Sequence, residues 1–372
     1  MMKTFLTLIA TALMLNSCTT TTSEPKELEY EITLGKVPTT AVFKNGDETT
    51  WSVWGASMIK DDNGLYHIFY SRWPKANGWV WAVDSEIARA TSTSPYGPWE
   101  FQEIVLPRRG VEYWDGWCTH NPTIHKFGDK YYLYYMGTTG DGREIEYPIS
   151  DEVRWLHRNN QRIGVAVADS PTGPWTRFDK PTLDVSSDDT APDCLITNNP
   201  AVSQTPDGRY LLLYKTAGKK KPLPVGGPVV HMVAFSDSPT GPFVKEDVLV
   251  FAVEGNDFPA EDPTIWYQDG KYRAIVKEMA SASNDWHASL IHYDSEDGIH
   301  WTPGKFQKVS DRQVTWEDGQ HYKLSHLERP QIFMENGEPL LILFAADTTD
   351  VNNVLHSFNI QVPVNIKKHE VE

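Results

Sequence analysis

The feature that most constrains the fold of this chain is an internal repeat that occurs five times. Each copy contains a short strand, a turn built from Asn or Asp with Gly, and a second strand rich in aromatic residues. Asn or Asp with Gly supplies the positive φ that a tight hairpin turn needs, so each copy predicts a β-hairpin. A residue pair marks the first strand of each copy: Gly55-Ala56, Asn121-Pro122, Asn199-Pro200, Asp262-Pro263 and Arg329-Pro330.

A second unit follows each of the first four hairpins and supplies the other half of a four-stranded sheet. An alternating strand precedes a Ser-Pro-x-Gly-Pro-aromatic turn in three copies, and residues 295–301 form a looser fourth copy. This repetition predicts an all-β fold, a five-bladed β-propeller with four-stranded antiparallel blades. A β-sandwich of similar size would not predict five matched copies. We expect residues 29–43 to close the ring, and each Pro to stand at the start of its strand.

The N-terminus has the order of features found in a lipoprotein signal. A positive start and an apolar run from Phe5 to Leu15 are followed by Asn16-Ser17-Cys18 and a polar stretch. The run is long enough for a secretory signal and too short to span a bilayer as a helix. The sequence therefore predicts a signal peptide over 1–17, a lipidated Cys18 with a tether over 18–27, and one propeller domain over 28–372. The expected location is the outer membrane, by lipid anchor only, with the periplasmic or surface face left open.

The charge of the chain excludes one class of partner. Lys and Arg number 34 against 50 Asp and Glu, which gives a formal net charge of −16. Because a nucleic-acid partner needs a basic face, we expect none. Apart from Cys18, only Cys118 and Cys194 are present, and they could pair or stay free. The one cofactor left open is a structural calcium ion in the channel, although no loop has a Ca²⁺-binding pattern.

The residues just before each Pro are expected to face one shared pocket, because the first strand of each blade lines the channel of a propeller. Outside the first blade these residues are all polar: His120, Asn121, Asn198, Asn199, Glu261, Asp262, Glu328 and Arg329. A hydrophobic core would not place charged groups there without partners. Five strands that bring polar groups to one pocket predict a small-molecule site.

In these features the chain resembles glycoside hydrolase families 43 and 117. The resemblance rests on the five-fold pattern, on the pairs of a polar residue and Pro in the first strands, such as Asp262-Pro263, and on the Ser-Pro-x-Gly-Pro-Trp units. It covers nearly all of the mature chain. It implies an exo-acting enzyme that degrades oligosaccharides from a polysaccharide, which could be anionic. Glu261 matches the family's acid position, and the neighbouring Asp262 would raise its pKa. The family's two Asp positions are not matched, so Glu328 or Asp115 would supply the second carboxylate.

Other residue types near the strand starts leave further chemistry open. The candidates for acid–base catalysis near neutral pH are His120, His231 and His326. The candidates for binding an acidic or neutral sugar are Arg72, Lys215, Lys277, Arg329, Asn121, Asn199, Trp54, Trp117 and Asp115. This set predicts, as the alternative, a lyase or dehydratase that eliminates from uronic-acid sugars, with a His or Lys base and an Arg or Asn that neutralises the developing enolate. A third reading is a glycan-binding lipoprotein without catalysis.

Overall fold

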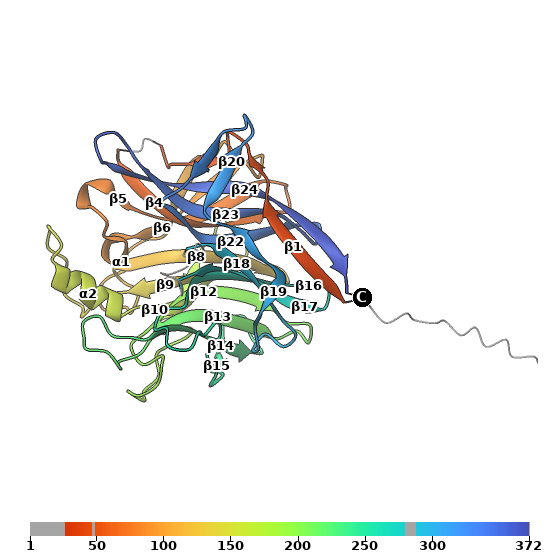
Figure 1. Ribbon diagram of the computed structural model, residues 1–372. Helices are drawn as coiled ribbons and strands as arrows, with labels where there is room; N and C mark the ends of the chain where they lie inside the picture. The colour runs from red at the N-terminus through yellow and green to blue at the C-terminus, as the bar shows by residue number, and fades with distance from the viewer. Residues whose placement is uncertain (1–26, 47–48, 280–287, 372) are drawn as a thin grey trace, which may run out of the picture.

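Five blades of antiparallel strands stand around a common channel in the computed structural model, which describes residues 27–46, 49–279 and 288–371, and the last two blades are joined in one nine-stranded sheet. The predicted five-bladed β-propeller is confirmed (Figure 1). Cys18, the signal peptide and nearly all of the tether lie outside the described residues. Within the described part no helix is long and apolar enough to cross a membrane.

Each of the first four blades is a meander of four consecutive strands. Blade one contains β4 (Trp51–Lys60), β5 (Tyr66–Pro74), β6 (Glu86–Ser92) and β7 (Glu100–Leu106). Blade two contains β8 (Cys118–Phe127), β9 (Lys130–Thr138), β10 (Arg162–Ala168) and β11 (Thr176–Arg177). Blade three contains β12 (Ile196–Gln204), β13 (Tyr210–Ala217), β14 (Val229–Ser236) and β15 (Val244–Lys245). Blade four contains β16 (Ala260–Gln268), β17 (Lys271–Glu278), β18 (Leu290–Ser295) and β19 (Thr302–Ser310).

The fifth blade joins the two ends of the chain. Three of its strands are β22 (His326–Glu335), β23 (Glu338–Thr349) and β24 (Leu355–Glu370). The fourth is β1 (Leu28–Leu34), which runs antiparallel to β24, and β3 (Val42–Phe43) also pairs with β24. The expected ring closure by residues 29–43 is therefore confirmed, and Figure 1 shows red β1 beside blue β24.

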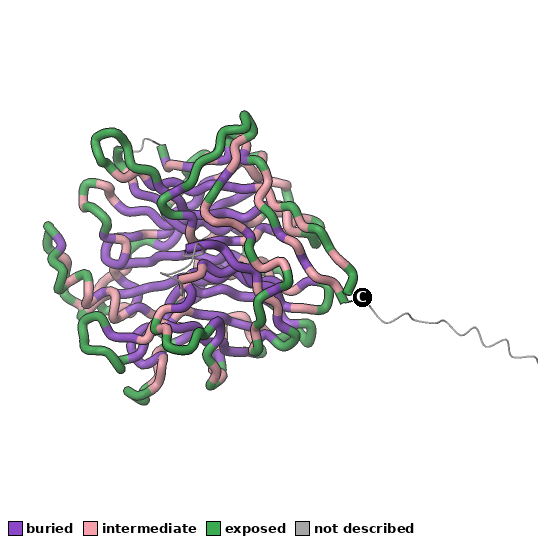
Figure 2. Tube along the Cα trace, in the orientation of Figure 1, coloured by how far each residue is buried: buried purple, intermediate pink, exposed green. Residues whose placement is uncertain are grey.

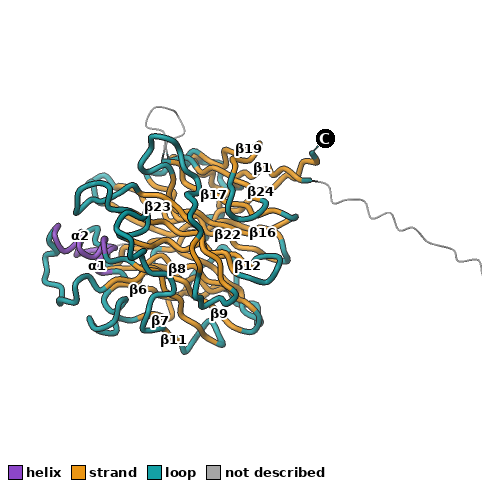
Figure 3. Tube along the Cα trace, turned by 90° about the horizontal axis from the view of Figure 1, so that it is seen from below, coloured by secondary structure: helices purple, strands orange, loops and turns teal. Residues whose placement is uncertain are grey.

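Short elements cover the margins of the blades. A small sheet contains β2 (Lys36–Val37), β20 (Gln313–Trp316) and β21 (His321–Lys323). The helices are η1 (Lys75–Asn77), α1 (Trp81–Asp84) and α2 (Asp151–Asn159). Figure 3 shows α1 and α2 together at one side of the molecule.

The core consists of apolar layers between neighbouring blades, and the two-residue period of a strand builds them. In β13, Leu211 and Leu213 pack in a cluster with blade four, while Leu212 and Tyr214 pack in a cluster with blade two. Successive side chains of a strand point to opposite faces, so a strand buried on both faces is apolar throughout. Figure 2 shows the resulting buried interior, with exposed positions at the loops.

Both cysteines of the described chain are free and buried. The Cys118 thiol lies 3.3 Å from the carbonyl oxygen of Trp81, and the Cys194 thiol lies 3.2 Å from that of Asp189. Each thiol thus has its own backbone acceptor, and the two cysteines form no disulfide.

The Pro residues do not stand at the start of their strands as expected. In β8, β12, β16 and β22 each lies inside the strand, where the pairing register shifts. The residue before each Pro has a positive φ of about 50°: Asn121, Asn199, Asp262 and Arg329. A β-bulge leaves its extra residue outside the hydrogen-bond ladder, so the missing N–H of Pro costs nothing there. Gly55 makes the same bulge in β4.

Candidate active site

The five bulges form a ring of side chains across the channel. The Asn121 amide donates to Asn199 at 2.7 Å, and the Asn199 amide donates to Asp262 at 2.6 Å. Arg329 donates to the same Asp262 oxygen at 3.4 Å. Gly55 fills the fifth place, where an added Cβ would lie 3.0 Å from the Asn121 side-chain oxygen and 3.5 Å from Arg329 Cγ. These side chains hydrogen-bond to one another, so the ring forms a polar floor across the channel.

The ring divides the channel, because the residues before and after the bulges face different cavities. In blades one, two, four and five the residue before the bulge lines a cavity of about 210 Å³, whereas Asn198 in blade three donates to Gln161 instead and is not in the lining. The side chains around this cavity are Trp54, Trp79, Trp81, His120, Asn121, Asn199, Lys215, Glu261, Asp262, Glu328 and Arg329. All five blades contribute, and nine of these eleven residues were predicted from the sequence as site residues; the exceptions are Trp79 and Trp81.

Two lysines hold the two glutamates of this cavity. Lys215 Nζ lies 2.7 Å from Glu261 Oε1, and Lys277 Nζ lies 3.3 Å from Glu261 Oε2. Lys277 also forms an ion pair with Glu328. The lysines come from the second strands of blades three and four, so each reaches across a blade boundary to a first strand.

The environments of the two glutamates shift their pKa values in opposite directions. Burial disfavours the charged form of Glu261, but Lys215 and Lys277 outweigh burial and lower its pKa to about 2. Burial raises the pKa of Glu328 above its ordinary value, and the charges of Asp262 and Glu261 add to this rise against Lys277. The expected rise in the pKa of Glu261 is therefore wrong, because the two ammonium groups decide its charge. Glu328 is the carboxyl group that more readily holds a proton.

His120 faces this pair from the other side of the channel. Blade two, which carries His120, stands opposite the boundary between blades four and five in a ring of five. The His120 Nδ1 atom lies 2.8 Å from the Ser85 hydroxyl, and its ring stacks on Trp81 with centroids 5.0 Å apart. Burial lowers the pKa of His120 well below its ordinary value, and Arg329 and Lys215 add to this. The imidazole is thus neutral near pH 7, and one nitrogen is already engaged.

Three tryptophans form the aromatic wall of the cavity. Trp54 lies edge-on to Trp79 with ring centroids 5.2 Å apart, and Trp79 is 39% exposed. A flat ring that is partly open to solvent can contact the C–H face of a sugar. Trp79, which stands beside α1, and Trp81, the first residue of α1, were not predicted from the sequence. The pair of Trp residues two positions apart after Gly78 was the available signal.

Six predicted site residues are absent from this lining: Lys277 and His326 line a neighbouring cavity, and the other four line neither. Arg72 pairs with Glu86 at 3.0 Å and lies over the rings of Trp51 and Phe101. Trp117 lies under the guanidinium group of Arg108. His231 is fully buried, and burial with the charge of Lys215 lowers its pKa to about 3.

Asp115 is the fourth, and it is fully buried outside the lining. It binds Arg109 at 2.6 Å, Tyr135 at 2.7 Å and Arg177 at 3.4 Å. Its oxygens are engaged by Arg109, which precedes β8, and by Tyr135 and Arg177 of blade two, so a role as the second carboxylate of the site has no geometric support.

His326 stands at the margin of the site. Its Nδ1 lies 2.6 Å from Asp347, and this hydrogen bond raises the pKa of His326. With Lys277 and Glu328 it lines a neighbouring cavity of about 180 Å³. Among the described residues no group of three or more His, Cys, Asp or Glu side chains is placed to hold a metal ion. The channel calcium stays a prediction.

This chain resembles solved structures, although its sequence alone matches no known family. No protein-family profile and no curated protein matches the chain. Zg3597, a family 117 glycoside hydrolase of the marine bacterium Zobellia galactanivorans, matches over 91% of each chain with a TM-score of 0.61 and 19% identity. A thermostable family-43 glycoside hydrolase matches over 89% of this chain and 93% of its own, with a TM-score of 0.56 and 14% identity. The arabinanase of Bacillus subtilis matches over 83% and 97%, with a TM-score of 0.51 and 17% identity.

The chain has the fold of these glycoside hydrolases. The resemblance inferred from the repeat is confirmed at this level, since identities below 20% over nearly the whole length describe the fold. Function depends on the site that is built on a fold and not on the fold alone.

Proposed function

We propose that this propeller is a glycoside hydrolase that removes terminal sugars from an oligosaccharide. The observation that carries the proposal is the opposite shift of the pKa values of Glu261 and Glu328 in one cavity. Pairs of titratable groups whose surroundings separate their pKa values are the usual way in which one site provides an acid and a charged partner. The described activities of the neighbours, a family 117 glycoside hydrolase and an arabinanase, support the same class of reaction.

Glu328 is the proposed general acid. Its raised pKa allows it to hold a proton and to donate that proton to the glycosidic oxygen as the bond to the sugar breaks. Glu261 stays ionised between two lysines and would stabilise the positive charge that develops on the sugar ring. The family resemblance assigns the acid role to Glu261, and the lysines argue for this exchange of roles.

His120 is the proposed general base. It is neutral, and the Ser85 hydroxyl holds its Nδ1, so Nε2 remains to accept a proton from water. The water oxygen attacks the anomeric carbon, its proton passes to His120, and the leaving oxygen takes the proton of Glu328. Because acid and base act from opposite sides of the sugar, the product is expected with inverted configuration.

The size of the cavity supports exo action. Pockets for drug-sized ligands have volumes of roughly 300–1,000 Å³. This cavity has about 210 Å³ above a closed polar floor, which suits one terminal sugar. In the lining, the positive charges of Lys215 and Arg329 offset the negative charges of Glu261 and Asp262. The cavity is therefore less acidic than the chain as a whole, and an acidic sugar could enter it.

Elimination from a uronic-acid sugar is the second candidate function. The same neutral His120, with Lys215 and Asn199 in one cavity, is a set that could take a proton beside a carboxylate and hold the resulting enolate. The two reactions differ in their use of water: hydrolysis adds one molecule, and elimination leaves an unsaturated sugar that absorbs ultraviolet light.

The test is incubation of the protein with neutral and uronate-bearing oligosaccharides in ¹⁸O-labelled water, followed by mass spectrometry and absorbance. Incorporation of one labelled oxygen supports hydrolysis, and an unsaturated product without the label supports elimination. The Glu328→Gln variant should lose turnover by about 10²–10⁴-fold. Glu103→Gln is the matched control, because Glu103 pairs with Arg89 in blade one. If Glu328→Gln retains the activity of the control, the assignment is wrong.

A further inference from the structure

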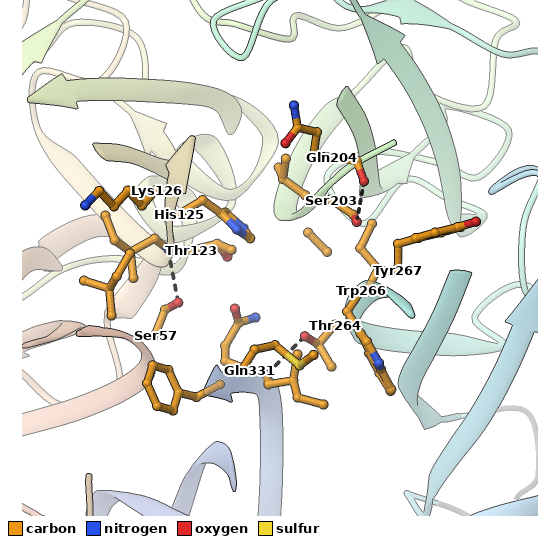
Figure 4. Close-up of a pocket in the computed structure, with 18 of the residues that line it drawn as sticks. Ser57, Thr123, His125, Lys126, Ser203, Gln204, Thr264, Trp266, Tyr267 and Gln331 are labelled. Atoms are coloured by element: carbon orange, nitrogen blue, oxygen red, sulfur yellow. Dashed lines mark hydrogen bonds between the residues drawn. The ribbon is translucent and has the colours of Figure 1, made fainter. Parts of the chain in front are cut away.

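The channel has a second cavity beyond the ring of bulges, with a volume of about 500 Å³. The residue two positions after each bulge residue lines it, so its inner wall is a second five-membered ring: Ser57, Thr123, Ala201, Thr264 and Gln331. Figure 4 shows side chains from this cavity around its opening. Exposed Gln204 and Pro206 belong to its lining, so the cavity opens to solvent. Nothing in the proposed reaction uses it.

The lining of this cavity is chemically unlike that of the catalytic cavity. All of its lining residues are described, and none is Asp or Glu. Its one Lys, Lys126, pairs with Asp62 at 2.7 Å and points away from the opening in Figure 4. Burial lowers the pKa of His125, which also lines the cavity, to about 4, so its imidazole is neutral near pH 7. A ligand of this cavity therefore meets hydroxyl, amide, imidazole and apolar groups and no available charge.

Two polar groups of the described lining lack a hydrogen-bond partner, His125 Nε2 and the amide nitrogen of Gln331. Ser57 accepts from the Ile124 N–H at 3.1 Å, and Thr123 donates to the Pro200 carbonyl at 2.9 Å. Gln331 is 4% exposed, and its amide nitrogen has no hydrogen-bond partner among the described residues. A buried donor that stays unpaired is costly, so its retention in the wall of an open cavity needs an explanation. Figure 4 shows the Gln331 amide directed toward the opening.

A neutral sugar matches this combination. Sugars carry many hydroxyl groups and no charge, and their C–H faces pack against apolar side chains such as those of Ile59 and Phe333 in the same wall. A volume of about 500 Å³ lies within the range of small-ligand pockets, roughly 300–1,000 Å³. We propose that this cavity is a second, non-catalytic site that binds one or two rings of a neutral saccharide, with a sugar hydroxyl accepting from Gln331.

Ligand-observed NMR by saturation transfer tests this proposal, with arabinose, galactose, glucose and lactose as probes. We expect at least one probe to bind the wild-type protein. Gln331→Leu keeps the volume of the side chain and removes the donor, so affinity should fall about tenfold, the effect of one lost hydrogen bond. Gln313→Leu, at an exposed position, is the matched control and should bind as wild type. Ser203→Trp, which would fill the opening, should abolish binding.

The Trp79→Ala variant separates this site from the catalytic cavity, where Trp79 stands. Binding that persists in Trp79→Ala and weakens in Gln331→Leu supports the second site, whether or not the protein hydrolyses any oligosaccharide. Binding lost only in Trp79→Ala would overturn it. The absence of saturation transfer to every probe would also overturn the proposal. A Gln331→Leu protein that melts higher and binds as before would overturn it too, because the Gln331 amide of the wild type would then bind only water.

Discussion

Replacement of Lys277 by Met tests whether its ammonium group holds the two glutamates of the site. Lys277 is 8% exposed at its side chain and is the group that contacts both Glu261 and Glu328. In the variant Glu261 keeps Lys215 at 2.7 Å, whereas Glu328 loses its ion pair. Breaking a buried ion pair by removing one partner costs about 3–5 kcal/mol of unfolding free energy, so we expect a loss in this range at pH 7.

The loss should depend on pH, and the direction follows from Glu328. Lys277 lowers the pKa of Glu328 against burial, so its removal raises that pKa further. A carboxyl group with a raised pKa in the folded state destabilises the fold at any pH above its ordinary pKa, and the cost is complete above the raised pKa. The cost disappears as the pH falls toward the ordinary pKa, where both states are protonated. The difference between variant and wild type should therefore shrink from pH 7 to pH 5, by at most about 1.4 kcal/mol per pH unit.

Urea unfolding at pH 7 and pH 5, followed by the fluorescence of the fourteen tryptophans, measures this difference. Lys60→Met is the control, because Lys60 pairs with Glu335 at the surface, and its effect should not change between the two pH values. The reasoning is refuted if Lys277→Met costs less than about 1 kcal/mol at pH 7. An equal loss at both pH values would also contradict it, because Glu328 would then not be the group that responds.

Four further predictions concern His120, Gly55 and Cys18. His120→Asn should lower kcat by about 10²–10⁴-fold in the oligosaccharide assay, and an unchanged kcat would remove His120 from the mechanism. Because burial lowers the pKa of His120, the wild-type rate should not fall as the pH is lowered through 6.5, whereas a half-loss there would indicate an ordinary exposed imidazole. Gly55→Ala should lower the unfolding free energy by about 1–2 kcal/mol, since φ is +47° and the new Cβ would meet Asn121 at 3.0 Å; calorimetry with an unchanged melting temperature would contradict this. Cys18→Ala should leave the protein without lipid and outside the membrane fraction. If mass spectrometry finds the same added mass on the wild-type protein and on the variant, lipidation at Cys18 is excluded.

The repeat made the site predictable in outline. Because one strand position recurs in each blade, Glu261, Glu328 and His120 could be assigned to one pocket from sequence although they are far apart in the chain. Lys215 was assigned to it from its equivalent place at a strand end. Trp79 has no counterpart in the other copies, and for that reason the repeat could not indicate it.

The roles within the site were less predictable, because charge states depend on neighbours from other blades. Asp262 is next to Glu261 in sequence, yet its side chain belongs to the ring of bulges, where it accepts from Asn199 and Arg329. The pKa of Glu261 is set by Lys215 and Lys277 from two different strands. Adjacency in sequence therefore gave the wrong direction for the shift.

The sequence by itself determined the architecture of this protein, because hairpin turns and alternating apolar strands are local features and each of the five repeats contains them. Only the tertiary structure decided which side chains pair across the channel, which carboxyl group holds a proton, and that the channel has two cavities. The physical reason is the range of the interactions. Turn geometry and strand period act over a few residues of chain, whereas burial and ion pairing depend on distances of about 3 Å between groups that the ring of blades brings together.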